Sequence, residues 1–124
     1  MNETVSAMLK AAKDAAETKR EKAILLHGLV GDVELAKLDL EARESELMTE
    51  ICAETNGDGK PRYSNETARK AELAVRIQQD DRYNDCWKVL DAAKLGVTNA
   101  QADRDYAHDL HRAYTAAMTA MSGD

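Results

Sequence analysis

Residues 54–66 read ETNGDGKPRYSNE and separate two long stretches that are rich in Ala, Leu, Glu, Lys and Arg. The segment holds the only proline of the chain and two of its six glycines. Asn, Asp, Gly and Pro favour turns, because glycine adopts positive φ without strain and proline fixes φ. We therefore expect a turn at residues 55–64 that reverses the chain between two helical arms.

The same segment has part of the pattern of a calcium-binding loop. A loop that starts at Glu54 would place Glu54, Asn56 and Asp58 at ligand positions and Gly59 at the sixth position. Its twelfth position is Asn65, which cannot supply the bidentate carboxylate that such a loop requires. The segment is therefore interpreted as a polar turn rather than as a calcium site.

Apolar residues recur at spacings of three and four on both sides of the turn, and this pattern predicts helices. We expect helices at approximately residues 3–27, 32–54, 65–79 and 82–122. Gly28 and Gly31 each weaken a helix by about 1 kcal/mol relative to alanine, and Asp32 is suited to cap a new helix, so a bend or short break is expected there. Ser64 or Asn65 is expected to cap the third helix, and Asp80 or Asp81 the fourth.

The last arm carries the longest apolar stripe: Tyr83, Trp87 (or Cys86), Leu90, Ala93, Val97, Ala100, Ala107, Leu110, Tyr114, Met118 and Met121.

These patterns predict a single all-α domain over residues 1–124, since no strand-like alternation occurs in the sequence. Two architectures fit: a long antiparallel, coiled-coil-like helical hairpin, or a four-helix bundle in which Gly28–Gly31 and Gly96 are true turns. Arms of about 50 residues would be roughly 75 Å long and would expose apolar surface on both helices. We favour the hairpin, with two or more chains associated as a homo-oligomer.

The composition excludes several classes of protein. Hydrophobic residues make up 44% of the chain and charged residues 32%, and no apolar run is long enough to span a membrane. The start MNETVSAMLK lacks the pattern of a signal peptide, so a cytoplasmic location is expected. Cys52 and Cys86 are too few for a disulfide scaffold. The net charge of −6 disfavours nucleic-acid binding, although the basic cluster near the turn keeps a nucleic-acid-binding accessory role open as the alternative function.

Metal binding and catalysis have little support in the sequence. Asp105, His108 and His111 have the spacing of metal ligands on one helix, but they fall on the flank of the stripe, where a solvated polar face is expected. No nucleophile elbow and no glycine-rich phosphate loop occurs. We predict a non-enzymatic protein with no cofactor and no metal.

Residues 59–83 resemble a group of small, uncharacterised helical coiled-coil proteins encoded by bacteriophages and prophages. The matching residues follow the pattern Gly-Lys-Pro-x-Tyr-Ser-Asn and then Ala-Arg-Lys-Ala-Glu: Gly59, Lys60, Pro61, Tyr63, Ser64, Asn65, Ala68, Arg69, Lys70, Ala71 and Glu72. The Ala-rich first fifty residues depart from the group. The resemblance implies a protein-binding accessory role in a bacterial host cell, linked to DNA recombination or host-defence factors, and it implies no enzymatic activity.

The second half of the turn segment, KPRYSNE, contains more than a turn requires. It combines basic side chains with a tyrosine at the junction of the two arms. We predict that the partner-binding residues lie in this segment and at the start of the following helix, and they are Lys60, Arg62, Tyr63, Arg69 and Lys70.

Overall fold

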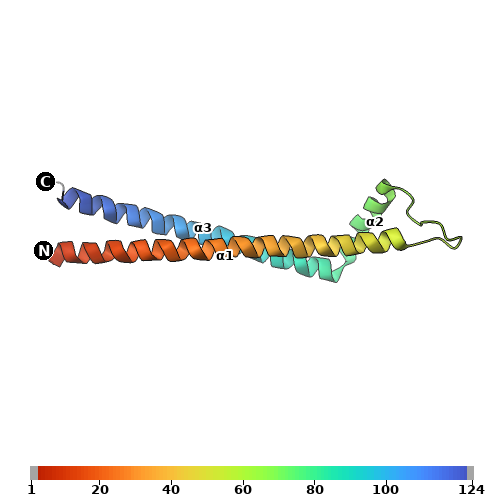
Figure 1. Cartoon of the computed structure of the whole chain (residues 1–124), viewed down its shortest axis with the longest axis horizontal. Coiled ribbons are helices and arrows are strands. Elements are labelled where there is room, and N and C mark those ends of the chain that lie inside the picture. The colour runs from red at the N-terminus through yellow and green to blue at the C-terminus, as the bar shows by residue number, and fades with distance from the viewer. Residues whose placement is uncertain (1–2, 123–124) are drawn as a thin grey trace. The chain divides into compact units, whose positions relative to one another are not determined.

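The computed structural model describes residues 3–122 and contains three α-helices (Figure 1). They are α1 (Glu3–Ala53), α2 (Glu66–Gln79) and α3 (Asp81–Ser122). The described residues contain no β-strand and only one isolated bridge, between Thr55 and Pro61. The predicted all-α helical hairpin is therefore confirmed.

The chain divides into two compact units, which are described separately. Unit 1 comprises residues 1–31 and 94–124, and unit 2 comprises residues 32–93. Unit 1 contains the first part of α1 and the last part of α3, which run antiparallel: Lys22 pairs with Asp103, and Leu29 lies beside Gly96. Unit 2 contains the last part of α1, the whole of α2 and the beginning of α3. The division does not decide whether the chain is one domain, and this stays a prediction.

We expected a bend or short break at Gly28–Gly31. The break, with separate helices at residues 3–27 and 32–54, is wrong, because α1 continues without interruption from Glu3 to Ala53. Gly96 likewise lies inside α3. The four-helix bundle required turns at Gly28–Gly31 and at Gly96, and it is excluded because both sites lie within continuous helices. Helix formation is cooperative, so a loss of about 1 kcal/mol at each glycine is outweighed where the flanking turns pack on a second helix. Leu26, Leu29 and Val33 continue the packed face of α1 across the glycines.

One face of α1 follows a regular heptad pattern. Residues spaced alternately by three and four from Val5 to Leu47 are all buried or half-buried, whereas most positions between them are exposed. This is the spacing of a coiled-coil seam. On α3 the corresponding position near the start of the helix belongs to Cys86, which is half-buried, while Trp87 is 44% exposed. The alternative assignment of Cys86 to the stripe is therefore the right one.

Unit 2 holds the larger side chains of the core. Ile51 is fully buried and forms a cluster with Leu47 and Leu73, so α2 packs against the end of α1. None of the described helices is long and apolar enough to cross a membrane.

Candidate functional site

The segment between α1 and α2 is held in one conformation by its own backbone. The amide of Asn56 donates to the carbonyl of Lys60 at 2.7 Å, and the amide of Gly59 donates to the carbonyl of Asn56 at 3.0 Å. Gly59 adopts φ of +80°, which side chains disfavour. The Asp58 carboxylate accepts from the Lys60 amide at 3.1 Å. The sequence ETNGDG therefore forms a closed turn, as predicted.

The second half of the segment is anchored to unit 2. The amide of Arg62 donates to the carbonyl of Glu54 at 2.9 Å, which closes the loop at its base. Tyr63 is half-buried and packs against the core cluster of Leu47, Ile51 and Leu73. Asn65 caps α2, because its side chain accepts from the amide of Ala68 at 2.8 Å. The loop is thus fixed at both ends and in the middle.

Arg76 of α2 joins the loop to both helices. Its guanidinium donates to the Glu54 carboxylate at the end of α1 and, at 2.9 Å, to Glu72 of its own helix. The hydrogen bond from Arg76 is the main cause that lowers the pKa of Glu72. Arg76 also lies 6.0 Å from the centre of the Tyr63 ring, and Arg62 lies 5.6 Å from it. Both distances are suited to cation–π attraction.

The five predicted contact residues fall into two groups. Lys60, Arg62 and Lys70 are exposed, whereas Tyr63 and Arg69 are half-buried. Arg69 donates to the carbonyl of Tyr63 at 3.3 Å, so both half-buried residues support the loop. Lys70 pairs with Glu66 on α2 at 3.0 Å. Within the described chain, Lys60 and Arg62 form no ion pair, and we call these two side chains the turn surface.

A second charged cluster lies where α2 ends and α3 begins, and only its helix cap was predicted from the sequence. Asp80 accepts two hydrogen bonds from Arg43 of α1, at 2.8 and 2.5 Å, and it caps α3 by accepting from the amide of Tyr83. The hydrogen bond from Arg43 is the main cause that lowers the pKa of Asp80 to about 2. Glu46 pairs with Arg43 at 2.9 Å and with Arg82 at 3.4 Å. The cap was predictable, but the partner on α1 was not.

The candidate metal ligands on α3 do not converge. Asp105 and His108 line one hollow of unit 1 together with Lys19 and Arg104, whereas His111 lines another. Asp105 is paired with Arg104 at 3.2 Å. Across residues 3–122, no group of three or more His, Cys, Asp and Glu side chains is arranged to hold a metal ion. The three residues therefore offer no geometry for metal chemistry.

A comparison of the chain with protein-family models, curated proteins and solved structures found no significant match.

Proposed function

We propose that this chain is a non-enzymatic helical accessory protein that binds a protein partner through the turn surface, Lys60 and Arg62. The observation that carries the proposal is the combination of exposure and rigidity at this loop. Both side chains are exposed, yet the backbone around them is fixed by hydrogen bonds and by Tyr63. A binding loop that is ordered before it meets its partner loses less conformational entropy on association.

The length of the loop supports the same proposal. Connections between packed helices usually need about 2–8 residues, and the segment from Glu54 to Asn65 is longer than this. Its second half adds a half-buried tyrosine and two exposed cations that a simple reversal of the chain does not require. Binding loops are commonly carried by a rigid scaffold in this way.

The chemistry of the turn surface favours an acidic partner. Both of its side chains are cationic, and the nearby Arg69, Lys70 and Arg76 are already engaged with a backbone carbonyl or with carboxylates. The resemblance of residues 59–83 to bacteriophage and prophage proteins supports a phage-derived partner system, connected with DNA recombination or host defence, in a bacterial cytoplasm. We also propose that the chain acts as a homo-oligomer.

Charge reversal at the turn surface tests the proposal. The variant Lys60→Glu/Arg62→Glu is compared with Lys88→Glu, which changes an exposed lysine on α3 of the same unit. Proteins captured by each tagged variant from host lysate are quantified by mass spectrometry. We expect a specific protein to be captured by the wild type and by Lys88→Glu and lost with the double variant. Equal capture by all three would overturn the proposal.

Nucleic acid is the alternative partner, because Lys60 and Arg62 are free of ion pairs in the described part of the chain. Binding of labelled DNA or RNA is measured by fluorescence anisotropy over a range of salt concentrations. Phosphate contacts give a steep decrease of log affinity with log salt, with a slope of about −0.7 to −0.9 per contact. Unit 2 contains nine Lys and Arg against fifteen Asp and Glu, a net charge of −6, which opposes such binding.

A further inference from the structure

Unit 1 has an unusually small core. Its buried residues within the described part of the chain are Ala15, Ala100 and Ala107, whereas unit 2 buries Ile51, Leu47 and Leu90 among others. Alanine removes little apolar area from water, and hydrophobic stabilisation is proportional to that area. Two helices that pack mainly through alanine leave their larger apolar side chains only partly covered.

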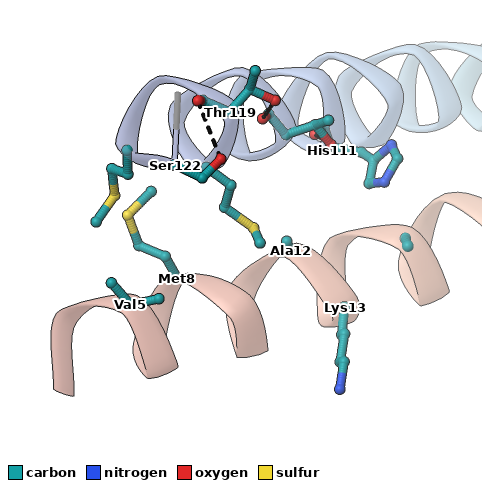
Figure 2. A pocket seen from close by; sticks show the side chains of 11 residues that line it. Val5, Met8, Ala12, Lys13, His111, Thr119 and Ser122 are labelled. Carbon is teal, nitrogen blue, oxygen red and sulfur yellow. Dashed lines mark hydrogen bonds between the residues drawn. The ribbon is translucent and has the colours of Figure 1, made fainter. Parts of the chain in front are cut away.

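The larger side chains gather in a groove at the end of unit 1. Val5, Met8 and Ala12 of α1 line it together with Met118 and Met121 of α3. Figure 2 shows Met8 and sulfur-containing side chains of α3 directed into the space between the two helices, while Lys13 points away from α3. Met121 is 45% exposed. One of the side chains that line this apolar groove is therefore about half accessible from outside it. We call this surface the methionine groove.

Polar residues bound the methionine groove along the helix pair. Lys19 and Lys22 occupy seam positions on α1, and Arg104 and His111 lie on the corresponding part of α3, all of them half-buried. Polar residues at seam positions fix the register and the number of helices that associate. The methionine groove lies beyond these polar positions, at the first turns of α1 and the last turns of α3, and His111 lines its inner end.

The charges of the chain favour contact between two copies at unit 1. Unit 1 contains eight Lys and Arg and eight Asp and Glu, so its net charge is zero, and the entire net charge of −6 belongs to unit 2. Two copies of unit 1 meet without net repulsion, whereas two copies of unit 2 repel each other. Surfaces with a net charge near zero also associate more readily.

The residues that line the groove suit contact with a second copy of the same surface. Met8, Met118 and Met121 contribute flexible thioether side chains, which adapt their shape to an apolar partner surface.

We infer that a second copy of this chain docks on the methionine groove. The contact is isologous: Met121 of each copy inserts into the groove of the other, so that four helix ends enclose a common core. This inference names the surface of the homo-oligomer that the proposed function includes, and it rests on that part of the proposal.

Sedimentation equilibrium of the full chain tests the inference over about 1–100 µM protein. We expect the wild type to have about twice the 13.7 kDa mass of one chain. Met121→Glu is expected to weaken the dimer by about a hundredfold or more, because each copy would bury an unpaired carboxylate. Met121→Leu keeps the apolar contact and is expected to stay dimeric.

Leu95→Glu is the matched control, since Leu95 is an exposed apolar residue of α3 in unit 1 that does not line the methionine groove. It is expected to leave the dimer unchanged. Circular dichroism verifies that each variant keeps its helices, and Met121→Gln replaces Met121→Glu if the carboxylate unfolds the chain. A monomeric wild type throughout the range, a dimer insensitive to both polar changes at Met121, or equal loss with Leu95→Glu would each overturn the inference.

The dimerisation test and the partner-capture test of the proposed function can fail independently of each other. Lys60→Glu/Arg62→Glu changes unit 2 only and is expected to leave the dimer intact. A dimer that survives while partner capture fails rejects the turn surface and keeps the methionine groove. A monomer that still captures its partner rejects the groove and keeps the turn surface.

Discussion

Arg43 and Asp80 form a two-pronged ion pair between residues that are 37 positions apart in the chain. The Nε atom of Arg43 lies 2.8 Å from Oδ2 of Asp80, and Nη2 lies 2.5 Å from Oδ1. The side chains are only 13% and 14% exposed. Because the same carboxylate accepts from the amide of Tyr83 at 2.7 Å, one side chain fixes the start of α3 and ties it to α1.

This ion pair predicts a loss of stability in acid. Asp80 has its pKa lowered from 3.8 to about 2, mainly by the hydrogen bond from Arg43. A carboxyl whose pKa is lower in the folded state stabilises the fold above its unfolded pKa and loses this effect as the pH falls through the folded value. We expect the stabilisation by Asp80 to be complete above about pH 4–5 and to disappear towards pH 2. Thermal unfolding followed by circular dichroism at several pH values measures it.

Asp80→Asn removes the titrating group and should flatten this part of the pH profile. At neutral pH the variant should unfold at a lower temperature than the wild type, because a neutral amide replaces the charged partner of Arg43. Asp81→Asn is the control, since Asp81 is the exposed neighbour. If Asp80→Asn and the wild type lost stability along the same curve, the ion pair would not be the cause.

Asp80 makes one local interaction, the helix cap, and one long-range interaction, the ion pair with Arg43, and only the local one could be predicted from the sequence. The caps at Asn65 and Asp80 have local signals, because a capping residue bonds to an amide a few positions away. The pairing of Asp80 with Arg43 depends on how α1 and α3 pack, and no local pattern records it. The continuity of α1 was missed for a similar reason, since the intrinsic cost of Gly28 and Gly31 is local and the packing that outweighs it is not.

The candidate site could likewise be predicted only in part. Its composition distinguishes KPRYSNE from an ordinary turn, but only the structure shows that Lys60 and Arg62 are exposed while Tyr63 is half-buried and supports the loop. The identity of Tyr63 as a tyrosine does not by itself distinguish a side chain that contacts a partner from one that packs on the core. Met118 and Met121 belong to the predicted apolar stripe of the last arm, but only the antiparallel pairing of α1 with α3 places them around one groove with Met8.

Tyr63 should contribute to stability through its ring. Tyr63→Ala removes a half-buried ring from the cluster of Leu47, Ile51 and Leu73, and we expect a loss of about 2 kcal/mol in the free energy of unfolding. Tyr63→Phe keeps the ring and should lose less than about 1 kcal/mol. Urea denaturation measures both. An unchanged stability of Tyr63→Ala would mean that the residue is available for a partner rather than for the fold.

Ile51 should be the most sensitive position of unit 2, because its side chain is fully buried between α1 and α2. Ile51→Ala is expected to lower the free energy of unfolding by about 2–5 kcal/mol. Val75→Ala removes an aliphatic side chain that is 48% exposed on α2, and it should change the free energy by less than about 0.5 kcal/mol. Equal effects of the two substitutions in urea denaturation would contradict the assignment of the core.

Two glycine-to-alanine substitutions should act in opposite directions. Gly59 adopts φ of +80°, where an alanine is strained, so Gly59→Ala is expected to destabilise the chain by about 1 kcal/mol. Gly28 lies within α1, and an added Cβ there meets no described atom within 4 Å. Gly28→Ala is therefore expected to stabilise the chain by about 1 kcal/mol.

Gly57→Ala is the control for the loop, because Gly57 has neither a positive φ nor a neighbour within 4 Å of the added Cβ among the residues described. It should change the stability much less than Gly59→Ala. Thermal and urea denaturation of the three variants measure the differences, and circular dichroism reports the helix content. Destabilisation by Gly28→Ala would place a turn or a buried contact at Gly28, which a continuous α1 with an exposed Gly28 does not allow.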